Sequence, residues 1–544
     1  MFNYLIFSMY MYMYFFFFFF FFLNLIIKNF LFIIYFNLMN YNSINYMLFF
    51  YFDWYVIIFI SFIFFIFSMI LIYSQIYMYN EYFKIQFIFL LFMFVLFMIF
   101  LIISLNIMSI MLGWDGLSMM SFMLVIYYQD KNSYNYGLIT ILMNRLGDIM
   151  LLFCIVLMYK FGSWNFLFYF NFNILFIIMI MLSSFIKSAQ FPFSSWLPLA
   201  MVAPLPVSSL VHSSTLVTIG IYMIFRFYNF IFLNLLFWVC MYTMIISGMK
   251  LILISDLKKL MAYSTMNHMS MMMYLIVIKN LNLMYLYMLI HAMFKSLMFL
   301  SVGMLIFNNL NIQDFRLMGN LKKNLPLSLL NFNISNLTMC GMPYFSMFYC
   351  KDLVYEYLNN LDFNFFFFFF FFFLMLSNLY FIKIIYYINY NNSMIYLFNF
   401  FENKMMVLSL MFLLMFMMMM GLILFNLFFY IYNLILISFM MKIFMLLIII
   451  LSIFFSLEIY NMMINNKFFY MMLNFWLMIY LKNYFFFNFY YFINLILNLV
   501  IVWLEYMIIM NFILNFKKLI LYFQFMMNNY FKIFMLFIIL MIFM

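Results

Sequence analysis

The chain has 544 residues, of which 72% are hydrophobic and 7% are charged, and its mean hydropathy is +1.18. A soluble domain carries about 25% charged residues, so this composition excludes a water-facing surface and indicates a membrane protein. In lipid only helices and closed barrels satisfy the backbone, and the long unbroken apolar runs exclude a barrel's short alternating segments. The sequence therefore predicts an all-α polytopic membrane protein with about 15–16 transmembrane helices at roughly 20 residues per span.

The net charge of +11 comes from 24 basic and 13 acidic residues. The basic residues form no cluster with interleaved aromatic residues, which disfavours nucleic acid as a partner. They favour loop lysines that face anionic lipid headgroups. The four cysteines form no C-x-x-C pair, and the three histidines are too few for a di-haem bundle. We therefore expect no metal or redox centre in this chain.

Helix-breaking residues are concentrated in the middle of the chain. All six prolines lie between Pro192 and Pro343, and ten of the eleven glycines precede Pro343. Because proline and glycine mark shaped helices, we expect an elaborated core over residues 105–400. Plain lipid-facing transmembrane helices are predicted on either side, over residues 1–104 and 401–503. The phenylalanine tracts are interpreted as lipid-facing filler.

Asp115 is the first candidate site residue in chain order. It follows a long apolar run and precedes another apolar helix, in the segment GWDGL. A charge at the bilayer centre costs about 2.5–3.5 kcal/mol or more and usually marks an ion or proton path. The alternative is an acid in a loop that caps the following helix.

Lys187 ends the apolar run 174–186, and Pro192 breaks the helix just after it. A broken helix exposes the ends of two half-helices, with which transporters build sites at mid-membrane. Burial disfavours the charged form of a lysine, so a buried lysine can exchange its proton near neutral pH. The alternative is a lysine at a helix end that extends to the headgroups.

Histidines mark the next two candidate positions. His212 follows four prolines and lies among serines and threonines, which can hydrogen-bond it or hold water. His291 and Lys295 are one helical turn apart and share one helix face, which indicates a relay of titratable groups. The alternatives are a packed histidine at His212 and a headgroup-facing pair at the other position. The charged segment 256–259 is interpreted as a loop.

Lys351 and Asp352 follow a second break, at Gly341-Met-Pro343. A lysine beside a proline break recurs here, although Lys187 precedes its proline and Lys351 follows. This is at best the weak internal symmetry expected of inverted repeats. The alternative is an ordinary loop pair of lysine and aspartate.

Seven segments resemble, in order, the antiporter-like subunits of mitochondrial NADH–ubiquinone oxidoreductase, respiratory complex I. The resemblance extends from about Leu105 to Asn360, and its long central block is the most specific part. The segments are GWDGLSMMSFMLVIYY, NRLGDIMLL, IKSAQFPFSSWLPLAMVAPLPVSSLVHSSTLVTIGIY, DLKKLMAYST, HAMFKSLMFL, QDFRLMG and GMPYFSMFYCKD.

The resemblance implies a fold. The family has two inverted five-helix repeats, each with one discontinuous helix, flanked by additional spans. A branch of it adds a long lateral helix and a last anchoring span. We expect both within residues 504–544, with the lateral helix over 504–532.

The resemblance also implies roles for the candidate residues. Lys187 matches the family's broken-helix lysine and Asp115 its acidic partner, which is often glutamate there. Lys351 matches the terminal lysine near the proton exit, with Asp352 beside it. The family's central polar axis corresponds to His212, His291 and Lys295. His268 matches no motif position, so we expect it to be structural.

A proton-translocating subunit of complex I in the mitochondrial inner membrane is the function that the resemblance implies. NADH, FMN, iron–sulfur clusters and ubiquinone would belong to other subunits. The expected partners are other membrane-arm subunits, especially the neighbouring antiporter-like one, and lipids including cardiolipin. The alternatives are a subunit of a multisubunit sodium/proton antiporter, which shares the repeats, and an inert scaffold, which buried lysines disfavour.

Overall fold

The computed structural model describes residues 2–429 and 447, apart from short gaps at 29, 42–43, 161, 167–168, 170–171, 320, 322–323, 361–363 and 391–401. The chain divides into one unit over Met1–Asn465 and another over Asn466–Met544, and all described residues belong to the first. The predicted lateral helix and final span over 504–544 lie outside the described residues. So do most of the helices predicted over 401–503.

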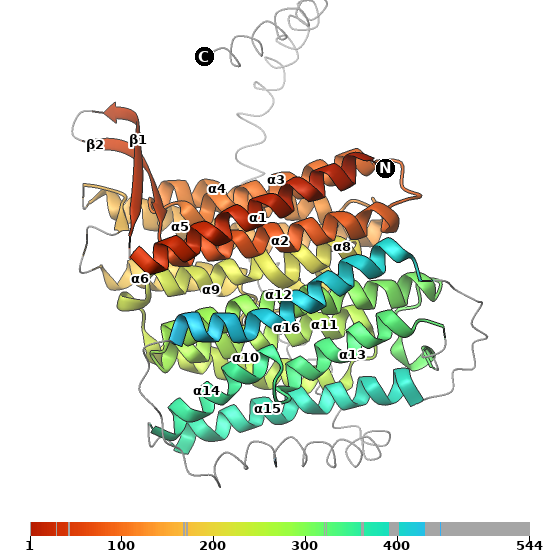
Figure 1. Ribbon diagram of the computed structural model, residues 1–544. Coiled ribbons are helices and arrows are strands. Elements are labelled where there is room, and N and C mark those ends of the chain that lie inside the picture. Colours follow the sequence, from red (N-terminus) through yellow and green to blue (C-terminus); the bar gives the residue numbers. More distant parts are fainter. Residues whose placement is uncertain are drawn as a thin grey trace, which may run out of the picture. The chain divides into compact units, whose positions relative to one another are not determined.

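Long apolar helices dominate the described part of the chain (Figure 1). Within that part, nine helical segments are long and apolar enough to cross a membrane. This confirms the predicted class of an all-α polytopic membrane protein. The segments contain α1 (Phe2–Lys28), α2 (Trp54–Tyr77), α3 (Lys84–Ile103), α4 (Ile107–Val125), α5 (Lys131–Tyr159), α8 (Leu205–Val207) with η2 (Ser208–Thr215) and α9 (Leu216–Arg226), α10 (Leu233–Leu253), α12 (Leu281–Asn308) and α16 (Lys404–Phe429).

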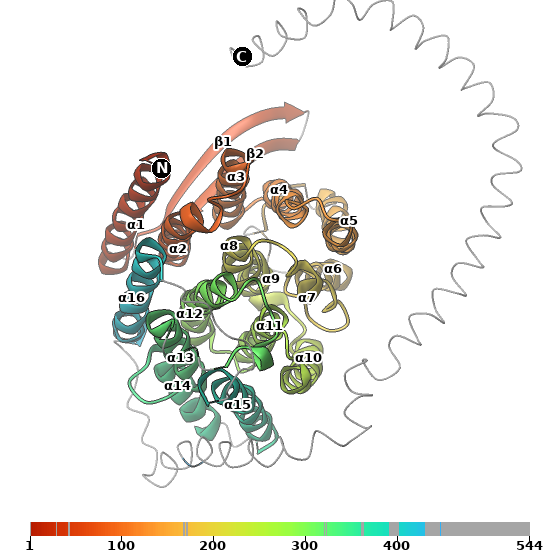
Figure 2. The ribbon, with the colours of Figure 1, turned by 90° about the vertical axis from the view of Figure 1, so that its right-hand side faces the viewer.

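Several other helices surround α12. In the view of Figure 2, α12 lies among α11 (Leu257–Val277), α13 (Pro326–Cys340), α14 (Ser346–Asn360) and α16, and it contacts all four. Its side chains are almost completely buried. The remaining helical elements are α6 (Ile174–Lys187), α7 (Trp196–Ala200), η3 (Tyr228–Phe230), η4 (Phe315–Leu317), α15 (Asn364–Ile385) and η5 (Tyr386–Tyr390).

The amino-terminal region contains a β-hairpin that the sequence analysis did not predict. Strands β1 (Phe32–Tyr41) and β2 (Ile44–Phe52) pair antiparallel, from Phe32 opposite Phe52 to Tyr41 opposite Ile44. Aromatic and β-branched residues fill both strands, which is the composition that favours a pleated surface. Residues 1–104, for which transmembrane helices are predicted, thus contain this hairpin in addition to α1, α2 and α3.

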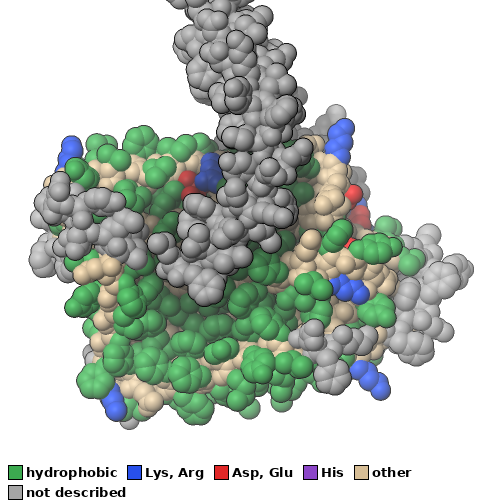
Figure 3. Space-filling view, turned by 90° about the horizontal axis from the view of Figure 1, so that it is seen from above, with side chains coloured by type: hydrophobic (Ala, Val, Ile, Leu, Met, Phe, Trp, Pro, Cys, Tyr) green, Lys and Arg blue, Asp and Glu red, His purple; other side chains and the backbone are tan. Residues whose placement is uncertain are grey.

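Apolar side chains cover the outside of the bundle. On α5, Leu142, Ile149 and Val156 recur at helical spacing and are 64%, 46% and 65% exposed. Figure 3 shows one face on which most of the described side chains are hydrophobic and the few charged ones lie mainly near the margins. Such a surface suits lipid as its solvent. The helix α2 differs, because it is largely buried and is not the plain lipid-facing span expected over residues 1–104.

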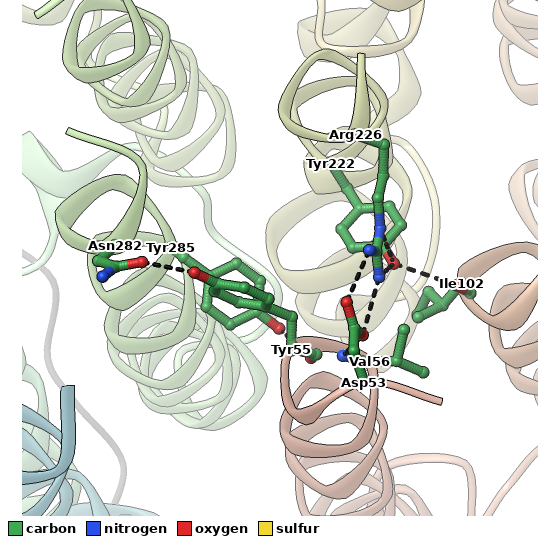
Figure 4. Close-up of polar contacts among 8 residues, drawn as sticks. All are labelled: Asp53, Tyr55, Val56, Ile102, Tyr222, Arg226, Asn282 and Tyr285. Carbon is green, nitrogen blue, oxygen red and sulfur yellow. Dashed lines mark hydrogen bonds and ion pairs between the residues drawn. The ribbon is translucent and has the colours of Figure 1, made fainter. Parts of the chain in front are cut away.

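A buried ion pair joins the start of α2 to the end of α9 (Figure 4). Asp53 caps α2 by accepting a hydrogen bond of 2.9 Å from the Val56 amide. Its carboxylate also accepts two hydrogen bonds from Arg226, of 2.8 and 3.1 Å. The Arg226 guanidinium donates to the Tyr222 hydroxyl, which in turn donates to the carbonyl of Ile102 in α3. The network therefore fixes three helices at one end of the bundle.

Candidate functional site

Lys187 lies at the carboxyl end of α6, where the predicted break occurs. Its side chain is 1% exposed. Its Nζ donates a hydrogen bond of 3.5 Å to the Trp114 carbonyl and lies 5.0 Å from the centre of the Trp114 ring. Gly220 of α9 allows this end of α6 to approach closely, because a Cβ there would lie 2.5 Å from the Ser184 carbonyl oxygen. The lysine is thus held by backbone and an aromatic ring.

Asp115 does not form an ion pair with Lys187 in the part of the chain that the structure describes. Instead its Oδ1 lies 3.0 Å from Arg145 Nη1 on α5. The same guanidinium nitrogen lies 3.1 Å from Asp148 Oδ2, one turn along α5. Asp148 is 2% exposed, and both carboxylates interact electrostatically with Lys187. An arginine therefore bridges two acids beside the buried lysine.

His212 lies in the π-helical segment η2, which continues directly into α9. It is 1% exposed, and its two ring nitrogens have no hydrogen-bond partner among the described residues. Its ring lies 6.3 Å from that of Trp196, whose indole Nε1 donates 3.0 Å to the carbonyl of Ile186. Segments of π-helix inside α-helices occur frequently at functional sites. Trp196 thus lies near the His212 ring and bonds the backbone of Ile186, the residue before Lys187.

His291 and Lys295 lie in the buried middle of α12, and both are 0% exposed. The Lys295 Nζ donates a hydrogen bond of 2.5 Å to Ser264 Oγ on α11. One turn further along α11, His268 Nδ1 shares a hydrogen bond of 2.6 Å with the Tyr287 hydroxyl of α12. The rings of His268 and His291 have centroids 5.6 Å apart. The structure therefore places His268, expected to be only structural, beside the predicted pair.

Lys351 lies on α14 just after the second helix break, and it is 2% exposed. Its Nζ donates to the Met339 carbonyl near the end of α13 and lies 5.7 Å from the centre of the Phe373 ring. Gly341 ends α13 at φ +81°, and a Cβ there would meet the Lys351 side chain at 2.9 Å. Asp352 is only partly buried. The helix break thus brings the Met339 carbonyl within reach of Lys351, and Gly341 leaves room for the lysine side chain.

Several buried or partly buried charged residues were missed by sequence reasoning. Arg145 and Asp148 are the charged residues of α5 after its first residue, Lys131. Charges inside a long apolar span are a signal of function. Lys250 is 4% exposed and its Nζ donates 3.3 Å to the Tyr263 hydroxyl. Lys258 is 8% exposed in the first turn of α11, so the expectation of a loop over 256–259 is wrong.

Buried titratable groups of this kind can pass protons from one to the next, because each can exist with or without its proton. In the described part of the chain, Lys187, Lys295 and Lys351 form no ion pair with a carboxylate within 4.0 Å. A buried ammonium without a counter-ion is costly, so these lysines are candidates for a function in ion or proton transfer.

Comparisons with known proteins identify the family of this chain. The family described as NADH:quinone oxidoreductase/Mrp antiporter, TM, matches residues 104–377. NADH-ubiquinone oxidoreductase chain 5 of Anopheles arabiensis is 41% identical over 347 residues, covering 61% of this chain and 90% of that protein. The chain 5 proteins of Anopheles gambiae and Apis mellifera ligustica are 40% and 46% identical, covering 61% and 47% of this chain. This chain spans 59% and 46% of their lengths.

A solved structure of the Mrp complex from Dietzia sp. shares the fold. Its TM-score is 0.68 at 19% sequence identity, and the match covers 79% of this chain and 51% of that chain. The family match includes Asp115, Lys187, His212, His291, Lys295, Lys351 and Asp352. On these matches, the chain belongs to the NADH:quinone oxidoreductase/Mrp antiporter family of membrane proteins.

Proposed function

We propose that this chain is the chain 5 subunit of mitochondrial NADH–ubiquinone oxidoreductase, respiratory complex I, and that it translocates protons across the inner membrane. The names of its relatives support membership in that enzyme. The observation that carries the transport role is the burial of Lys187, Lys295 and Lys351, which are 1%, 0% and 2% exposed. An inert scaffold gains nothing from such costly groups.

In this proposal electron transfer takes place in other subunits, which hold the FMN, the iron–sulfur clusters and the ubiquinone. This chain responds to it by moving protons between its buried groups. The arginine bridge is suited to the response, because Arg145 can favour one carboxylate or the other. A shift toward either acid changes the field at Lys187 and hence its hold on a proton. Anionic lipid, including cardiolipin, is the expected contact for the exposed basic residues.

A sodium/proton antiporter subunit is the second candidate function. The shared fold of the Mrp complex structure favours it. That likeness is at 19% identity, whereas the chain 5 relatives are 40–46% identical. We therefore rank complex I first.

The identity of the parent complex can be tested in native membranes. After gentle solubilisation and a native gel, the band that oxidises NADH is excised and its chains are identified by mass spectrometry. We expect this chain in the large NADH-oxidising band. Its presence only in a smaller assembly without NADH activity would favour the antiporter function, and sodium/proton exchange would then be measured in vesicles containing that assembly.

A further inference from the structure

His268 is a buried titratable group for which the sequence motifs give no role. It lies on α11, is 0% exposed, and is surrounded by side chains of α12 and α15. Its Nδ1 is engaged by Tyr287, but its Nε2 has no hydrogen-bond partner among the described residues. One ring nitrogen is therefore available to accept a proton.

On one side His268 faces the predicted relay pair. The centroid of its ring lies 5.6 Å from that of His291, whose two nitrogens also have no partner within the described chain. One water molecule could bridge such nitrogens, because a buried water needs two or more polar partners. Lys295 is one turn from His291 on the same helix and interacts electrostatically with His268.

On another side His268 faces the surroundings of Lys351. The rings of His268 and Phe373 meet edge to face, with centroids 5.5 Å apart. Lys351 Nζ lies 5.7 Å from the centre of the same Phe373 ring, and it also interacts electrostatically with His268. Thus α11 supplies a titratable group that is near both the α12 pair and the α14 lysine.

We propose that His268 is a proton carrier between the His291–Lys295 pair and Lys351. This inference rests on the proposed function. A proton leaves the His291 imidazolium, whose N–H bond breaks, and a new N–H bond forms at His268 Nε2. His268 then carries a positive charge with Nδ1 still bonded to Tyr287. When the proton passes on to the Lys351 amine, His268 returns to its neutral form, and no electrons are transferred.

The test compares two variants in the intact, assembled complex. His268→Gln keeps a polar group that can bond Tyr287 but cannot carry a proton under these conditions. Tyr287→Phe removes that hydrogen bond and leaves the imidazole in place. We expect His268→Gln to lower the number of protons pumped per NADH oxidised by the same fraction as Lys351→Met. Tyr287→Phe should cause a smaller loss, whereas a purely structural histidine predicts the reverse order, which would overturn the proposal.

A control variant and a comparison with Lys351→Met separate a failure of the His268 proposal from a failure of the proposed function. Met269→Leu, a volume-conserving change at the next buried position of α11, should leave pumping and assembly unchanged. Normal pumping by His268→Gln together with loss in Lys351→Met would overturn the role of His268 alone. Normal pumping by both assembled variants would overturn the proposed function as well. If His268→Gln does not assemble, His268→Asn is measured in its place against the same controls.

Discussion

At the scale of single residues, Lys187 is the clearest case of a buried cation held without a carboxylate. Its Nζ contacts a carbonyl and the Trp114 ring, while the nearby acids are bridged by Arg145. The acids therefore act on the lysine through space, and their effect can change when the arginine moves. Asp115, with 39% side-chain exposure, is the one of the two acids that lies at the surface of the chain.

Removing the Lys187 amine should stop proton transfer through this part of the chain. In Lys187→Met, we expect the rate of proton translocation through this subunit to fall about a hundredfold, the lower range for a positioned proton-transfer group. The measurement is proton uptake by vesicles during NADH oxidation, normalised to assembled complex. Lys131→Met, at an exposed position at the start of α5, is the control and should pump normally. Normal pumping by assembled Lys187→Met would contradict the role.

Gly220 tests whether the position of Lys187 matters apart from its charge. An added methyl group would lie 2.5 Å from the Ser184 carbonyl oxygen and 2.8 Å from the Ser188 amide nitrogen. Because both are backbone atoms, the end of α6 has to shift. We expect Gly220→Ala to lower stability by about 1–3 kcal/mol, as overpacking does, and to reduce pumping with Lys187 intact.

The matched control is Gly147→Ala, also on a helix. Its added methyl group would meet its nearest neighbours at 3.7 Å, which is ordinary contact. Thermal stability of the solubilised complex and pumping are measured for both variants. Equal behaviour of the two would show that the close approach of α9 to α6 is not required.

At the scale of elements, the Asp53–Arg226 pair fixes α2, α3 and α9 together. The side chains of Asp53 and Arg226 are 6% and 14% exposed. Asp53→Asn keeps the helix cap but leaves the guanidinium without its counter-ion. Breaking one partner of a buried pair costs about 3–5 kcal/mol, so we expect a lower melting temperature and less assembled complex.

The comparison is the exposed pair of Lys259 and Asp256, whose atoms lie 2.7 Å apart. Lys259→Gln should cost about 1 kcal/mol or less, because water and salt screen an exposed pair. Both variants are measured by thermal melting of the solubilised complex. If Asp53→Asn melts no earlier than Lys259→Gln, the buried pair does not hold the three helices.

The helix breaks were predictable from sequence, and the hairpin was not. Lys187 and Lys351 each lie beside a proline in an apolar setting, a signal carried by a few adjacent residues. The strands β1 and β2 are about as hydrophobic as a span, and hydrophobicity alone does not separate a short apolar strand from part of a helix. Local pattern thus identified the broken helices but not the turn between two strands.

The contacts between helices could not be predicted from the sequence either. The bridge from Asp115 to Asp148 through Arg145 depends on how α4 packs against α5. The position of His268 beside His291 depends on the packing of α11 against α12. The tract ending at Phe373 was interpreted as filler, yet that ring contacts both His268 and Lys351. Such pairings are set by tertiary packing, which residue type alone does not specify.

At the scale of the whole molecule, the buried groups form two clusters joined by one continuous element. One cluster surrounds Lys187 and the other surrounds His291, Lys295 and Lys351. The segment η2 with His212 contacts α12, and α9, which continues from it, contacts α6. A proton path along this element would use both clusters, and on that path the clusters should act in series.

A double variant distinguishes a series from two independent paths. In a series, Lys187→Met and Lys351→Met each interrupt the same route, and the double variant pumps as many protons per NADH as the more damaged single variant. Residues that act as one unit are non-additive in this way. With independent routes, the second substitution removes protons that the first had left, and the two losses combine. Proton uptake and NADH oxidation are measured together in vesicles for the four forms of the complex. A loss in the double variant clearly beyond either single loss would show that the two lysines serve separate routes, and that His212 does not join them.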